Sequence, residues 1–197
     1  MSLFSDIKNA SISMDAYVSQ WNTRVQSGMK GLSVDERKML MHQKYNVSRR
    51  TKTLSEFTPS SDLTSLLKTL EENQNWIVIT EDWCGDSSFN LAIIEAIANS
   101  SKEISLNIVE RDKDTFIIDQ FLTNGGRAIP ILLSFNNDGK LLFKWGPRPQ
   151  KLIDYRQTLV EEGLEKERIV PKLMDAYDSG EWIHTESEIF NLIKNLK

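Results

Sequence analysis

The chain's only cysteine, Cys84, stands at a position where a thiol can do chemistry. It follows the apolar run 76–80, which predicts a buried strand, and it precedes a helical pattern that extends to Ala98. A helix N-terminus carries partial positive charge and unpaired N–H groups, which favour a thiolate. The position therefore predicts a nucleophilic cysteine, against the ordinary interpretation of a lone cysteine as a small buried apolar residue.

Two opposing influences act on the pKa of this thiol. The helix start and a Ser87 hydroxyl that donates to the sulfur would lower the pKa, whereas Glu81, Asp82 and Asp86 are nearby negative charges that would raise it. Because charges at an exposed site are screened, we expect a pKa modestly below the value of about 8.5 for a free cysteine.

Composition narrows the class of protein. A chain of 197 residues is long enough for one main domain with extensions, and its net charge of -4 argues against nucleic acid or an anionic membrane as the main partner. No apolar stretch has the length of a membrane span, and the first residues lack a secretory pattern. A single cysteine forms no intramolecular disulfide, so a reducing cytoplasm is the expected location. His42 and His184 stand outside any ligand-like spacing, so we expect no metal and no resident cofactor.

The first region, 1–57, is predicted to be a helical extension. Tyr17, Trp21 and Val25 recur at a spacing of four, which is typical of one apolar helix face. The sequence 33–36 fits a capping box that opens a second helix. Basic residues then follow at Lys44, Arg49, Arg50 and Lys52. They indicate a solvated helix end, with an anion site as the alternative.

The second region, 58–148, alternates element types. A helix is predicted from Pro59, a strand over 76–80, the cysteine helix, a strand over 104–108, a short helix over 113–122, and a hairpin of strands over 130–135 and 141–145. This order predicts a mixed sheet with helices on its faces. The following stretch 145–149 is predicted to be a rigid connector, in which Arg148 is an alternative ligand for a substrate carboxylate.

The third region, 149–197, is predicted to be a second helical extension, packing on the middle one. Leu152, Tyr155 and Leu159 form one apolar stripe. Pro171 is expected to break and restart the chain, and the pair 179–180 to punctuate it. The sequence 185–188 fits a second capping box, which would open the last helix.

Three segments of the middle region resemble the thioredoxin superfamily. The sequence 83–87, Trp-Cys-Gly-Asp-Ser, is similar to the Trp-Cys-Gly-Pro-Cys motif; 128–133 is similar to the loop with a cis-proline facing the cysteine; and 138–146 is similar to the closing hairpin. The motif and the terminal extensions resemble a bacterial thioredoxin-like branch. The resemblance implies an α/β thioredoxin-like fold, a central mixed sheet flanked by helices. The site residues that it implies are Cys84, Ser87 and Asp86 for catalysis and Trp83, Gly85, Ile129 and Pro130 for substrate binding.

The departures from the family pattern limit the chemistry. Ser87 stands where the family has its resolving cysteine, and a serine hydroxyl cannot attack a mixed disulfide. Asp86 replaces the motif proline, and Val78 stands where thioredoxins carry a buried acid. For Asp86, Ser87 and Trp83, plain structural roles are equal alternatives. The chain by itself cannot run a dithiol cycle.

These observations leave several functions open. The first is a monothiol thiol-disulfide oxidoreductase, in which Cys84 attacks a disulfide-containing protein or a small mixed disulfide and an external thiol, small or protein-borne, resolves it. The parallel with monothiol glutaredoxins adds iron–sulfur cluster binding as a distant option. The second is a non-catalytic module that holds an extended peptide on the Pro130 face. A thiol peroxidase ranks last. The substrate, the resolving thiol and the oligomeric state do not follow from the sequence.

Overall fold

The computed structural model describes residues 2–196, which form strands and helices joined by loops. The strands are β1 (Ile12–Ser13), β2 (Gln74–Thr80), β3 (Ile104–Glu110), β4 (Ile131–Phe135) and β5 (Leu141–Trp145). The helices are α1 (Leu3–Ala10), α2 (Met14–Gln26), α3 (Val34–Glu56), α4 (Ser61–Leu67), α5 (Gly85–Asn99), α6 (Thr115–Asp119), α7 (Gln150–Glu161), α8 (Lys166–Asp178), the 3-10 turn η1 (Glu181–Ile183) and α9 (His184–Lys194).

The strands form one mixed sheet in the order β1-β3-β2-β4-β5. Strand β2 runs parallel to β3 and antiparallel to β4, while β4 and β5 form the predicted hairpin. The parallel pair needs a crossover, and α5 supplies it. The mixed sheet and the α/β class expected from the sequence are thereby confirmed.

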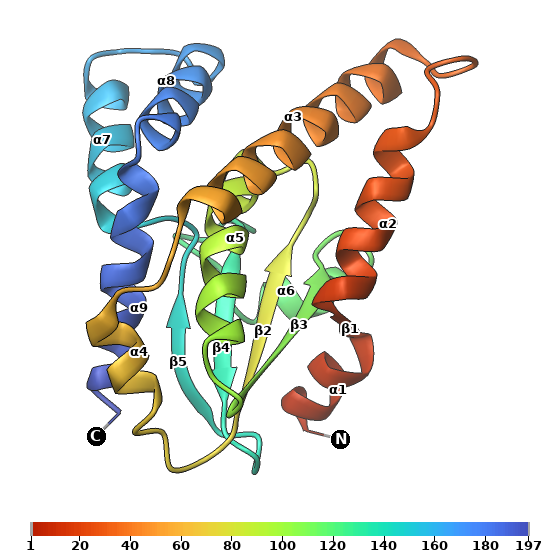
Figure 1. The fold of residues 1–197 in the computed structure, drawn as a ribbon. Helices are drawn as coiled ribbons and strands as arrows, with labels where there is room; N and C mark the ends of the chain where they lie inside the picture. The colour runs from red at the N-terminus through yellow and green to blue at the C-terminus, as the bar shows by residue number, and fades with distance from the viewer. Residues whose placement is uncertain (1, 197) are drawn as a thin grey trace.

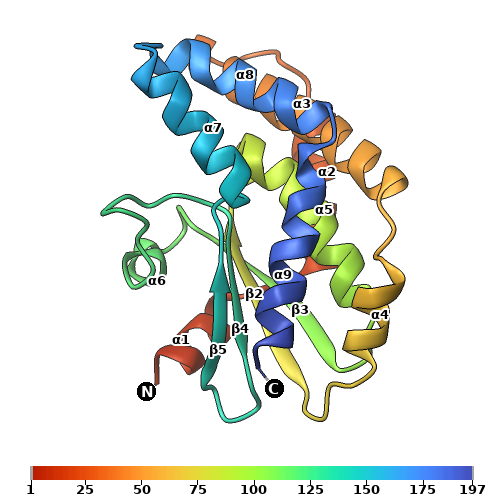
Figure 2. The ribbon, with the colours of Figure 1, turned by 90° about the vertical axis from the view of Figure 1, so that its left-hand side faces the viewer.

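Helices cover both faces of the sheet (Figure 1; Figure 2). Side chains alternate along β2, so Trp76 and Val78 face one layer while Ile77 and Ile79 face the other. The first layer is built from α2, α4, α5 and α9, and the second from α1 and α6. The main core therefore draws on residues from all three regions of the sequence, including Tyr17 and Trp21 near one end and Ile189 and Ile193 near the other.

The N-terminal region differs from its prediction in two places. Besides helices it contributes β1, which pairs antiparallel with β3 at the sheet edge. The Ser33 capping box is confirmed, but α3 runs on through the basic residues to Glu56. The prediction of a solvated helix end is wrong for Arg50, which is 9% exposed and ion-paired with Glu95 of α5.

The C-terminal region also corrects two predictions. Pro171 does not break the chain but lies inside α8, on its exposed side, where water can bond the carbonyl that a proline leaves free. The second capping box is wrong, because α9 already begins at His184. Its residues bind distant partners instead: Thr185 donates to Asn90 (2.7 Å), and Glu186 accepts from the Ser60 N–H (2.7 Å). Tertiary hydrogen bonds have replaced the local cap.

After β5 the chain does not return directly to the sheet. Helices α7 and α8 form a hairpin that lies over the N-terminal end of α5, and α9 then packs beside α5 on the sheet (Figure 2). This α7–α8 hairpin brings residues far along the sequence to the turn that carries Cys84. Within residues 2–196, no helix has the length and apolar character required to cross a membrane.

Candidate functional site

Cys84 occupies the N-cap position of α5, directly after the loop that leaves β2, and its side chain makes no capping hydrogen bond. Its backbone N–H donates to the Glu81 carbonyl (3.2 Å), which tightens the turn. Its Sγ donates to the carbonyl oxygen of Ile129 (3.4 Å). The predicted strand-to-helix junction is therefore confirmed, and the thiol points at the loop that precedes β4.

That loop carries Pro130, and the Ile129–Pro130 peptide bond is cis, as the sequence resemblance implies. Both residues are buried. Trp83 is partly buried and lies under the Arg111 guanidinium, 4.8 Å from the ring centroid. The structure thus brings together Trp83, Cys84, Ile129 and Pro130, four of the residues expected at a site.

The thiol is less reactive at rest than the sequence predicts. Cys84 is 8% exposed, and this burial, with a further contribution from the Asp86 charge, raises its pKa to about 11. Hydrogen bonds from Ser87 and the positive charge of Arg148 offset only part of the rise. The expectation of a pKa below that of a free cysteine is wrong, because it treated the site as exposed and burial opposes the charged thiolate.

Asp86 and Arg148 form a bidentate ion pair beside the thiol. Arg148 Nε lies 2.9 Å from Asp86 Oδ1 and Nη2 lies 2.6 Å from Oδ2. The two side chains are 17% and 12% exposed, Arg148 first. Arg148 is therefore paired with a carboxylate of its own chain, and Asp86 has a charged partner as well as its place in the first turn of α5.

Ser87 lies in the first turn of α5 and is almost fully buried. Its hydroxyl accepts a hydrogen bond from Thr80 Oγ1 (2.7 Å), at the end of β2. The same residue stabilises the thiolate form of Cys84 through hydrogen bonds. The serine therefore links the end of the strand to the sulfur.

Two residues of α8, Met174 and Tyr177, complete the site, and neither was predicted to belong to it. A Cβ added to Gly85 would lie 2.6 Å from Sδ of Met174, so α8 rests on the cysteine turn. The Tyr177 ring stacks on Phe89 with centroids 4.7 Å apart, and its hydroxyl accepts from Asn90 (2.9 Å). An apolar stripe along 169–177 indicates that α8 packs on something, but it does not indicate what.

Glu81 and Asp82, which the sequence places near the thiol, have their side chains bound elsewhere. Glu81 accepts the backbone N–H of Asp112 (2.7 Å), and Asp82 accepts from Arg24 (2.6 Å) and Gln43 (2.8 Å). Tyr17 is buried in the same neighbourhood, and its hydroxyl has no hydrogen-bond partner among the described residues. These carboxylates anchor the loop before Cys84 to α2, α3 and the end of β3.

Glu81 should make stability depend on pH. Burial raises the pKa of its carboxyl to about 7, although the Asp112 N–H opposes the shift. An unfolded chain binds this proton with a pKa of about 4.3. Between these values the native state holds more protons, so stability should rise as pH falls from 7 to 4.5, on the order of 2 kcal/mol.

The variant Glu81→Gln keeps an oxygen for the Asp112 N–H and removes the titration. Urea unfolding of both proteins at several pH values between 4.5 and 8 measures the difference. We expect the stability of the variant, relative to the parent, to improve as pH rises. Parallel stability curves for the two proteins would contradict the assignment.

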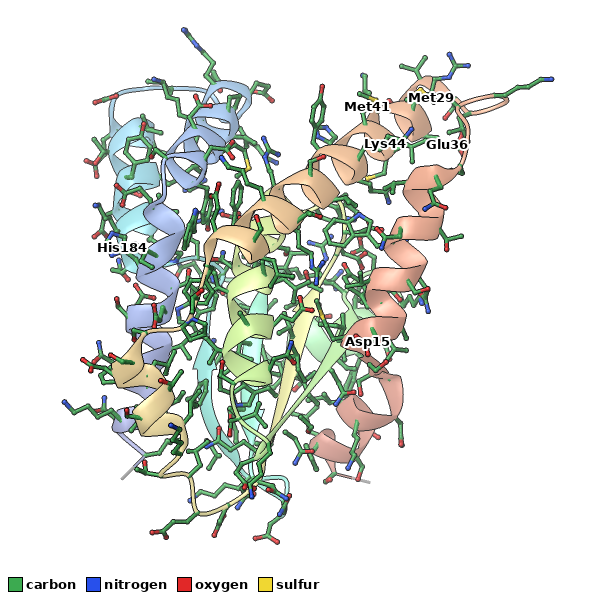
Figure 3. The ribbon with its side chains drawn as sticks, in the orientation of Figure 1. Asp15, Met29, Glu36, Met41, Lys44 and His184 are labelled. Atoms are coloured by element: carbon green, nitrogen blue, oxygen red, sulfur yellow. The ribbon has the colours of Figure 1, made fainter. Side chains whose placement is uncertain are left out.

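Metal-binding side chains do not gather at this site or elsewhere in the described part of the chain. No group of three or more His, Cys, Asp or Glu residues between 2 and 196 is placed to hold an ion. Figure 3 shows His184 on α9, while Met41, the neighbour of His42, lies far from it on α3.

Comparisons with known proteins agree with this geometry. A family model described as thioredoxin matches residues 31–160. The chain is similar over 100% of both lengths to a protein of unknown function from Pseudomonas aeruginosa, with 22% identity and a TM-score of 0.67. It is also similar to an HIV epitope scaffold, over 97% of both chains, with 21% identity and a TM-score of 0.64. No curated protein matches. At these identities the solved structures show the fold alone.

Proposed function

Because the chain belongs to the thioredoxin family, we propose that it binds an extended segment of a partner protein across Cys84 and Pro130, and that the Cys84 thiol is neutral in the free protein and takes no part as a nucleophile. The observation that carries this proposal is the state of the thiol. It is 8% exposed and donates to the Ile129 carbonyl.

The chemistry of the motif supports binding over turnover. A dithiol enzyme uses its second thiol to release the product from the mixed disulfide. Position 87 is a serine, whose hydroxyl accepts a hydrogen bond from Thr80 and forms one with the Cys84 sulfur. A thiol with a pKa of about 11 is almost entirely protonated at neutral pH. Such a group contributes contact area and a weak hydrogen bond more readily than it attacks a disulfide.

The Pro130 loop suits an extended partner. Strand β4 is an interior strand that begins one residue after Pro130, so the backbone of Ile129 extends beyond the end of the sheet toward the thiol. An extended segment can pair with such backbone and place alternate side chains in neighbouring pockets. Here those side chains would meet Trp83 and Cys84.

A monothiol oxidoreductase is the second candidate, and the place of Cys84 at the N-terminus of α5 favours it. The Cys84 thiolate would attack one sulfur of a partner's disulfide, forming a mixed disulfide and releasing the other sulfur as a thiolate. An external thiolate, from a small molecule or another protein, would then attack the partner's sulfur in the mixed disulfide, forming a new disulfide with the partner and releasing the Cys84 thiolate. This cycle needs no resident cofactor, and a reducing cytoplasm would supply the thiol.

A capture experiment separates the two candidates. Immobilised wild-type protein, Cys84→Ala and Pro130→Ala are incubated with lysate of the source cell, and retained proteins are eluted first with salt and then with dithiothreitol. Binding without chemistry predicts the same salt-eluted proteins for wild type and Cys84→Ala, and their loss in Pro130→Ala. Proteins released only by dithiothreitol, and absent from Cys84→Ala, would favour the oxidoreductase and overturn the first candidate. Circular dichroism confirms that each variant is folded.

A further inference from the structure

The Asp86–Arg148 pair is a partly buried ion pair that adjoins Cys84. Four elements face the thiol. Helix α5 brings Asp86 and Ser87, the Pro130 loop brings the Ile129 carbonyl, the segment after β5 brings Arg148, and α8 covers the turn with Met174. Tyr177 of α8 interacts with both members of the pair. Asp86 and Arg148 are thus the charged groups that act on the sulfur.

We infer that Arg148 is a positioning residue of the Cys84 site: it fixes the Asp86 carboxylate on the first turn of α5 and balances its charge beside the thiol. The inference rests on the proposed function in taking the Cys84 face as the working surface, but it concerns the thiol of the free protein and can be tested without a partner.

The backbone holds Arg148 in a defined place. Gly146, two residues earlier, approaches the Pro130 loop so closely that an added Cβ would lie 2.2 Å from the Pro130 carbonyl oxygen. Arg148 then extends to Asp86 with two parallel hydrogen bonds, the geometry in which a guanidinium best matches a carboxylate. The segment 146–148 therefore connects the Pro130 loop to the cysteine turn.

The two charges of the pair act on the thiol in opposite directions. The Asp86 carboxylate disfavours a thiolate two residues away, and the Arg148 guanidinium favours it. If the pair had only a structural role, it would stabilise the turn, and its two charges would not have opposite effects on the thiolate. Removing either partner of a structural pair would loosen the turn and expose the sulfur, so both variants would then make the thiol more reactive.

The test is the rate of Cys84 alkylation by iodoacetamide between pH 7 and 10.5, followed by intact mass. Arg148→Met should slow alkylation at pH 9 by about tenfold and Asp86→Asn should speed it by about tenfold, as a shift of one pKa unit requires. Arg148→Lys should lie near the wild-type rate, and so should the double variant Asp86→Asn/Arg148→Met. Lys151→Gln, which breaks the exposed pair with Glu181 on the same extension, is the matched control and should change nothing.

Rates that move in the same direction in Arg148→Met and Asp86→Asn, or that do not move, would overturn the inference. Should Arg148→Met fail to fold, the double variant decides: a return to the wild-type rate supports charge balance, whereas a rate above that of Asp86→Asn overturns it. Partner capture is a separate readout, so the proposed function can fail while this inference holds, and the reverse.

Discussion

Replacing Gly146 with alanine is expected to destabilise the protein by at least about 3 kcal/mol, a large part of the 5–15 kcal/mol typical of a domain. Gly146 has a φ of +117°, which side-chain-bearing residues rarely adopt. The added Cβ would also lie 2.2 Å from the Pro130 carbonyl oxygen and 3.3 Å from the Ile131 Cα, both backbone atoms that cannot rotate away. Either β5 or the Pro130 loop must move.

Two other glycines separate the cost of the positive φ from the cost of the steric clash. Gly125 has a φ of +76° with nothing within 4 Å of the added Cβ, and Gly28 has open space with no left-handed φ. Urea unfolding followed by circular dichroism should show little change for Gly28→Ala, a cost of about 1–2 kcal/mol for Gly125→Ala, and the largest cost for Gly146→Ala. A Gly146→Ala protein no less stable than Gly125→Ala would show that the close approach to Pro130 is not part of the native structure.

The second large effect is in thiol reactivity. With a pKa of about 11, Cys84 at pH 7 should carry about 300-fold less thiolate than a free cysteine with a pKa of about 8.5. Alkylation by iodoacetamide should be slower by the same factor, because the thiolate is the reacting form. The rate should then rise about tenfold per pH unit up to pH 10 or beyond.

The protein unfolded in urea supplies the reference, since its one cysteine is then a free thiol of the same sequence. Intact mass after timed quenching gives both rates without ambiguity. A native protein that alkylates as fast as the unfolded one, with an inflection below pH 9, would contradict the buried neutral thiol. It would also move the monothiol oxidoreductase ahead of the binding module.

Local signals in the sequence were enough to predict most of the helices and strands of the middle region. The apolar run before Cys84, the helical pattern after it and the turn at Gly139 each act over a few residues, and each element was found in place. The proline loop was identified by resemblance, and its placement against the sulfur was confirmed. The domain boundaries at 57 and 148 stay a prediction, although the main core takes side chains from both sides of each.

The failures arose where distant partners decide the outcome. Thr185 fits a capping box, but Asn90 of α5 binds its hydroxyl. Strand β1 has two residues, which are too few to show the alternation typical of a strand. It forms because the edge of β3 is open to pairing. The thiol pKa depends on burial by segments up to ninety residues away, and neither Asp82 nor Glu81 nor any other local residue indicates that burial. Met174 and Tyr177 could not be assigned to the site for the same reason.

Because of the contact between Gly85 and Met174, the residue types accepted at these two distant positions depend on each other. Sδ of Met174 occupies the volume that any side chain at position 85 would need. A larger residue in the cysteine turn is compatible with this fold only if the Met174 side chain turns aside, position 174 becomes smaller or α8 moves away. Substitutions at the two positions should therefore be accepted in pairs as such proteins diverge, and the C-terminal helices cannot be lost without reopening the turn that carries the thiol.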